Sequence, residues 1–82
     1  MDPRQVIRIA AENDNYIIVP HALGEADKDS VSICQVEDVM IRGIINQSDP
    51  NNCRYRLSYR GIQIVAEIIH DEVVIVTVMR DK

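Results

Sequence analysis

The sequence contains no phenylalanine and no tryptophan, and its only aromatic residues are three tyrosines. Ile, Val, Leu and Met must therefore build the core. Hydrophobic residues still make up 46% of the chain, which argues against disorder. A chain of 82 residues is too short for two domains or for a large enzyme barrel. We expect one domain over residues 1–82.

Long apolar runs and metal-binding motifs are also lacking. No run approaches the roughly 20 residues of a membrane span, and the N-terminal residues do not resemble a secretory signal, so we expect a cytoplasmic protein without membrane contact. Cys34 and Cys53 are too few for a disulfide framework. Because close ligand pairs are missing, we expect no metal; a mixed zinc site of both cysteines with His21 and His70 is the weaker alternative.

Basic residues are scarce: nine stand against 13 acidic ones, for a net charge of -4. This balance opposes broad, nonspecific nucleic-acid binding, which depends on neutralising phosphates. The basic residues are unevenly distributed, however, and several lie within Cys53–Arg60. One small basic site is compatible with this charge pattern.

Three helices are expected in the first half. Asp2-Pro3 is typical of a helix start, and Ser32 with Gln35 forms a capping-box pattern. Gly43 supplies a C-terminal stop. The helices are expected over Pro3–Glu12, over about 21–29 in a weaker form, and from Ile33 to Gly43.

Strand patterns dominate the rest of the chain. They occur at 16–19, 44–47, 53–60, 62–69 and 73–79, with tight turns between the last three. The sequence therefore predicts an α+β fold of two layers, with the N-terminal helices packed on one face of a four- or five-stranded antiparallel sheet. The expected core contains Ile17, Val36, Val39, Met40, Leu57, Ile64, Val74, Ile75 and Val76.

The last strand, Val73–Met79, is apolar on both faces. It is either a central strand covered on both sides or one whose open face is completed by a partner.

The strand 53–60 alternates with period two, so that Arg54, Arg56 and Arg60 point to one side. Guanidinium groups spaced in this way can follow an RNA backbone, because the planar fork of arginine matches phosphate oxygens. The alternative is a solvated sheet face kept soluble by its charges.

Four further side chains could take part in chemistry. Tyr55 and Tyr59 could stack on a base or donate a proton, although their position on the apolar face favours core packing. His21 could act as a general acid or base, or it could simply bond to backbone at a helix start. Arg80 could stabilise charge or pair with a surface carboxylate.

The chain resembles the RelE/ParE-like toxin superfamily. The resemblance rests on a short strand, His21-Ala22, a helix, then VSICQVEDVMIRG, a turn, CRYRLSYRGIQIVAEI and a terminal VVIVTVMR, and it covers about residues 16–80. The nearest patterns are BrnT-like and MqsR-like small bacterial proteins and a related domain family of unknown function.

This resemblance implies a RelE-like fold and the toxin half of a toxin–antitoxin pair. Such a toxin cleaves mRNA, often on the ribosome, without metal or other cofactor, and a cognate antitoxin inhibits it. We expect Arg56, Arg80, Tyr59 and His21 to be catalytic and Arg54 and Arg60 to bind RNA.

In this reading the four arginines of the last strands converge on one open face, and Arg4 on the first helix has no part in cleavage. The alternative is a catalytically inactive RelE-like module that binds a protein or forms a homodimer. The acidic segment HALGEADKDS favours this alternative, because similar proteins often carry basic residues there.

Overall fold

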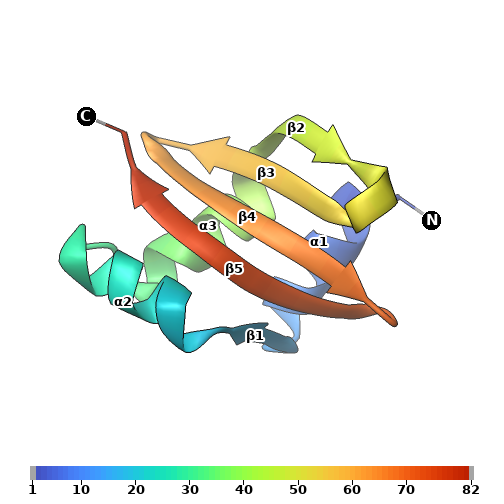
Figure 1. Ribbon diagram of the computed structural model, residues 1–82, viewed down its shortest axis with the longest axis horizontal. Helices are drawn as coiled ribbons and strands as arrows, with labels where there is room; N and C mark the ends of the chain where they lie inside the picture. The colour runs from blue at the N-terminus through green and yellow to red at the C-terminus, as the bar shows by residue number, and fades with distance from the viewer. Residues whose placement is uncertain (1, 82) are drawn as a thin grey trace.

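The computed structural model describes residues 2–81, in which a five-stranded sheet is backed by helices (Figure 1). Helices and one short strand come first and a run of four strands follows, as the sequence predicts. The elements are α1 (Pro3–Glu12), β1 (Tyr16–Ile18), α2 (Pro20–Lys28), α3 (Ile33–Arg42), β2 (Ile44–Asp49), the short 3-10 turn η1 (Pro50–Asn52), β3 (Arg54–Tyr59), β4 (Ile62–Ile69) and β5 (Glu72–Arg80).

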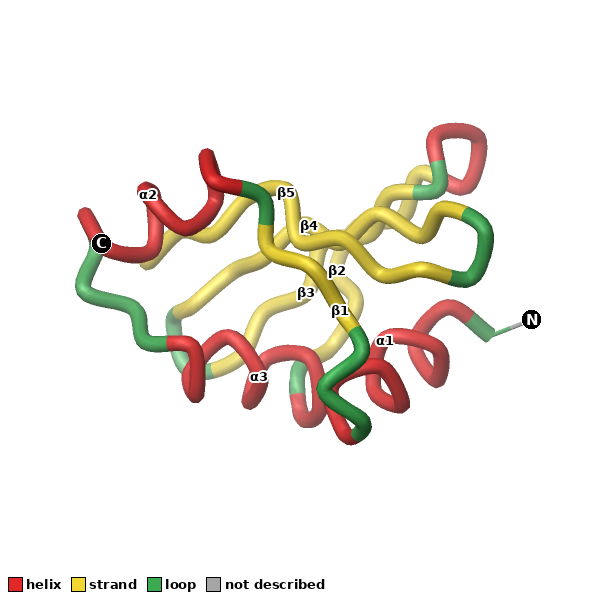
Figure 2. The backbone as a smooth tube through the Cα atoms, turned by 90° about the horizontal axis from the view of Figure 1, so that it is seen from below, coloured by secondary structure: helices red, strands yellow, loops and turns green. Residues whose placement is uncertain are grey.

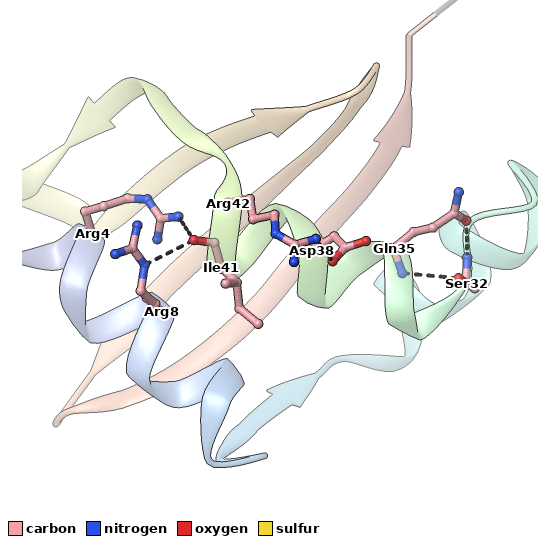
Figure 3. Close-up of polar contacts among 7 residues, drawn as sticks. All are labelled: Arg4, Arg8, Ser32, Gln35, Asp38, Ile41 and Arg42. Atoms are coloured by element: carbon pink, nitrogen blue, oxygen red, sulfur yellow. Dashed lines mark hydrogen bonds and ion pairs between the residues drawn. The ribbon is translucent and has the colours of Figure 1, made fainter.

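The helix starts follow from their capping residues. Asp2 accepts a hydrogen bond from the Arg4 amide at 3.0 Å, and Pro3 is the first residue of α1. At α3 the Ser32 hydroxyl accepts from the Gln35 amide at 3.1 Å, and the Gln35 side chain accepts from the Ser32 amide at 2.8 Å. This capping box, drawn in Figure 3, confirms the predicted start of α3. Helix α2 has no side-chain cap, which agrees with its weaker sequence signal.

The strands lie in the order β1-β5-β4-β3-β2. From β2 to β5 each strand pairs antiparallel with the next, because short turns connect them. Strand β1 instead runs parallel to β5, with Tyr16 opposite Val73 and Ile18 opposite Ile75. The α+β fold with N-terminal helices packed against a sheet is confirmed. The parallel pairing is an addition that the sequence did not predict, since no hairpin ties β1 to its neighbour.

The helices take two different positions relative to the sheet. Helices α1 and α3 lie together behind one face, where α3 packs on β3 and β4 (Figures 1 and 2). Helix α2 lies alongside β5, beyond the point where β1 ends (Figure 1). One face of the sheet is therefore covered by α1 and α3, while the described residues leave the opposite face open.

The core lies between the sheet and helices α1 and α3. Most expected core residues are buried, and small helix residues such as Ala10, Ala11, Ala22 and Ala26 allow close packing. The fully buried large side chains are Ile7, Val36, Val39, Met40, Leu57, Ile64, Val73, Ile75 and Val78.

The prediction was wrong for Ile17, whose side chain is 48% exposed. Ile17 lies opposite Val74, and both are on the open face. Val74 and Val76 are half-buried for the same reason. Strand β5 lies between β1 and β4 over Val73–Ile75 and at the edge of the sheet beyond them, and within residues 2–81 only one of its faces is covered.

Candidate functional site

A hollow of about 310 Å³ lies on the open face of the sheet, across strands β2 to β5. Leu57 of β3 is buried towards the helices, so its neighbours along the strand point the other way. Arg56 lies opposite both Gln47 of β2 and Val65 of β4. The hollow is lined by Gln47, Asp49, Arg54, Tyr55, Arg56, Val65, Val76 and Thr77.

The two arginines of this hollow differ in their electrostatic surroundings. Arg54 lies opposite Glu67 on β4, and its Nε donates to the Glu67 carboxylate at 2.7 Å. Arg56 is half-buried and takes part in none of the ion pairs found among residues 2–81. The positive charge available to a ligand in the hollow is therefore mainly that of Arg56.

One carboxylate faces the same hollow. Asp49 ends β2, and its Oδ2 accepts a hydrogen bond from the Asn52 side chain at 2.8 Å. The bond holds the carboxylate in place while its second oxygen takes no hydrogen bond from the described residues. Sequence reasoning missed Asp49 because Ser48-Asp49-Pro50 reads as a turn signal. Only the sheet register places it opposite Arg54, in the hollow that Arg56 also lines.

Tyr59 and Arg60 lie away from the open face. The Arg60 guanidinium stacks over the Tyr59 ring, with its carbon 5.3 Å from the ring centre. Tyr59 faces a separate hollow of about 130 Å³ beside Gln35 and Asp38 of α3. Arg60 has a φ of 51° in the turn between β3 and β4 and is exposed. Neither residue lines the hollow that contains Arg56.

Arg80 is occupied by backbone contacts. Its Nε donates to the Asp29 carbonyl at 3.0 Å and its Nη2 to the Ser30 carbonyl at 2.9 Å. These bonds fasten the end of β5 to the connection between α2 and α3. The expected convergence of four arginines on one open face was therefore wrong, because Arg80 lies opposite Ile62, on the helix-covered side.

His21 lies in the first turn of α2, at the β5 edge of the sheet. Its side chain is 78% exposed, and its Nε2 is 3.6 Å from the Glu25 carboxylate. It does not line the hollow with Arg56. The only expected site residues that the structure brings together there are Arg54 and Arg56. Tyr55 also borders the hollow, but its side chain packs against the core.

Arg4 and Arg8 form a second basic group at the C-terminus of α3 (Figure 3). Arg4 donates to the carbonyls of Met40, Ile41 and Gly43 at 2.6, 2.8 and 2.8 Å, and Arg8 donates to that of Ile41 at 3.1 Å. Burial and, secondarily, the charge of Arg8 lower the pKa of the Arg4 guanidinium. Arg4 therefore has a structural role. A substitution at Arg4 would disturb the fold and cannot serve as a neutral control in a cleavage assay.

The described residues contain no group of three His, Cys, Asp or Glu side chains placed to hold a metal ion. Cys34 and Cys53 are both exposed free thiols. In the same residues, no helix has the length and apolarity needed to cross a membrane.

Comparison with known families gives one match. The model of a domain of unknown function, DUF4258, matches residues 18–80, which run from the last residue of β1 to the end of β5 and include every residue that lines the hollow. No curated protein and no solved structure matches the chain.

Proposed function

We propose a function for this chain, which belongs to the DUF4258 family: it binds mRNA on the open face of its sheet and cleaves it. It would act as the toxin of a toxin–antitoxin pair, with side chains rather than a cofactor supplying the chemistry. The observation that carries this proposal is Arg56, a half-buried cation without an ion-pair partner among the described residues, in a hollow that also holds a carboxylate.

The hollow offers side chains for two of the three requirements of RNA cleavage. The 2′-hydroxyl must lose a proton, the phosphorane must be stabilised, and the leaving 5′-oxygen must gain a proton. We assign the proton acceptor to Asp49 and the charge stabiliser to Arg56, whose fork suits phosphate oxygens. Water supplies the proton to the leaving oxygen, because the Tyr55 side chain packs against the core. The 2′-oxygen then bonds to phosphorus as the 5′-oxygen departs, which leaves a cyclic phosphate and a free 5′-hydroxyl.

The proposed site differs from the one expected from sequence. Arg56 keeps its role and Arg54 stays beside it as an RNA contact, weakened by its pairing with Glu67. Arg80 is assigned a structural role through Asp29 and Ser30.

A second function, binding of a partner protein without catalysis, is favoured by a different feature of the same face. Ile17, Val74 and Val76 form an apolar area beside the hollow, and Ile17 is largely solvent-exposed. A partner that covers such an apolar surface removes it from water, which stabilises a small domain. In the toxin proposal the antitoxin covers it, and in the second function the contact is the whole activity.

Induced expression in a host without the partner tests the toxin function. The parent should arrest growth and cleave a reporter mRNA. Arg56→Ala should lose cleavage by about 10²–10³-fold, as expected for loss of one preorganised charge stabiliser. Lys28→Ala removes an exposed positive charge on α2 and serves as the control that keeps full cleavage. Equal cleavage by the parent and Arg56→Ala would reject this site.

A parent protein that neither cleaves mRNA nor arrests growth would reject the toxin function and favour the second function. In that case the cognate partner protein should bind the parent and not Ile17→Lys, which places a charge in the apolar area outside the hollow. The two variants therefore separate catalysis from partner binding on one face.

A further inference from the structure

The two edges of the sheet are treated differently in this fold. Beyond the end of β1, the edge of β5 is covered by α2, whose acidic side chains replace a neighbouring strand. Glu25 accepts a hydrogen bond from the Val78 amide at 3.3 Å, and Asp29 accepts from the Arg80 amide at 3.2 Å. Covering an edge in this way prevents pairing with other chains.

The other edge, β2, lacks such cover. This strand runs for six residues, Ile44–Asp49, and β3 is its only neighbour in the sheet. It contains no proline and no lysine, the residues that usually protect an edge, and its one irregularity is a bulge between Ile45 and Gln47. Ile44 is 69% exposed, more than any other large hydrophobic residue of the described chain.

The two ends of β2 carry opposite charges. At its start, Arg4, Arg8 and Arg42 surround a hollow of about 360 Å³ that Ile44 also lines. Figure 3 shows these three arginines around the end of α3. Asp49 is the last residue of the strand. An antiparallel copy of the same strand would place each charged end beside its opposite.

We propose that two copies of this chain pair antiparallel through β2, forming one continuous sheet across a two-fold axis. Ile44 of each copy then lies opposite Asp49 of the partner subunit. Arg42, whose solvent-exposed ion pair with Asp38 spans 3.2 Å, approaches the same carboxylate. Such an interface is self-complementary, as two-fold symmetry requires. A two-fold axis perpendicular to the sheet keeps both open faces on one side, with the two Arg56 hollows next to the shared edge.

Sedimentation velocity over a range of concentrations tests this dimer. The parent should show a concentration-dependent mass shift towards a dimer. Ile44→Lys should weaken dimerisation at least tenfold, because a charge on an edge strand opposes pairing. Leu23→Lys, at a residue 44% exposed on α2, is the matched control and should dimerise like the parent. A parent that is monomeric at all concentrations overturns the proposal.

Two further variants identify the surface. Ile17→Lys alters the open face and should leave the dimer intact; loss of the dimer in this variant alone would instead assign the interface to the open face. Arg42→Glu and Asp49→Lys should each weaken the dimer, and the double variant should restore it. Failure of the double variant to recover would refute the proposed strand register. Because the readout is mass, these results are independent of RNA cleavage.

Discussion

The arginines of this protein have different roles, and the groups that each side chain contacts determine its role. Arg4 saturates three carbonyls at the end of α3, Arg80 ties β5 to the α2–α3 connection, and Arg54 pairs with Glu67. Arg56 alone among these four takes part in none of these structural contacts. Most of the few basic side chains of this acidic chain therefore make structural contacts. Phosphate groups can be bound only in the small area around the remaining ones.

Arg4 provides a stability prediction. Arg4→Ala leaves the carbonyls of Met40, Ile41 and Gly43 without their charged donor, and should lower the free energy of unfolding by about 2 kcal/mol. Arg4→Lys should recover only part of this loss, because an ammonium cannot match the planar fork. Urea denaturation of both variants measures the effect. Full recovery with lysine would show that charge alone matters at this position.

Tyr16 predicts a dependence of stability on pH. Its hydroxyl donates to Glu37 at 2.5 Å, and burial followed by this hydrogen bond raises the Tyr16 pKa above its usual 10.0. The contribution of Tyr16 is therefore complete below pH 10 and is lost as pH rises, because the unfolded chain ionises first.

Denaturant unfolding between pH 8 and 11 tests this dependence. The parent should lose stability more steeply than Tyr16→Phe, which has no proton to release. Parallel curves for the two proteins would contradict a raised Tyr16 pKa.

At the scale of elements, the junction between α3 and β2 is a single, crowded residue, Gly43. A Cβ on Gly43 would collide with the Val39 carbonyl and come within 3.0 Å of the Ser58 carbonyl, so this glycine is required by close approach rather than by a left-handed backbone. The sequence predicted the helix stop correctly, while the crowding that requires a glycine comes from the Val39 carbonyl of α3 together with the Ser58 carbonyl of β3.

A pair of alanine substitutions tests this junction. Gly43→Ala should cost about 1–3 kcal/mol, because two backbone carbonyls must move. Gly24→Ala on α2 meets no atom within 4 Å and should stabilise the protein by about 0.5–1 kcal/mol, as expected inside a helix. Thermal unfolding of the two variants should shift in opposite directions. A loss of stability in Gly24→Ala would contradict the open space around that residue.

The whole molecule carries a net charge of -4, and the proposed RNA site offers two arginines, one already paired. Binding to single-stranded RNA should therefore depend weakly on salt, with a slope of about -1 in a plot of log affinity against log salt concentration. Fluorescence anisotropy between 50 and 300 mM salt would measure it. A slope steeper than about -3 would require a larger basic surface than the one described.

The sequence by itself determined the local structure of this protein. Capping by Asp2 and Ser32, the stop at Gly43, the alternation of apolar residues in β3 and the apolar runs of β4 and β5 are local features of the chain. The elements and the α+β class could therefore be predicted. The candidate site could be predicted only in part. Arg54 and Arg56 share a strand face by period two, and their side-by-side placement follows from that local rule.

Tertiary structure alone decided which residues meet across elements. The parallel position of β1, the exposure of Ile17 and the placement of Asp49 opposite Arg54 all depend on strand order and register, which local pattern does not encode. The acidic residues of α2 show the same limit. In sequence they appear as a solvated helix face, whereas in the fold Glu25 and Asp29 bind strand amides more than 50 residues away, because packing brings α2 against the edge of β5.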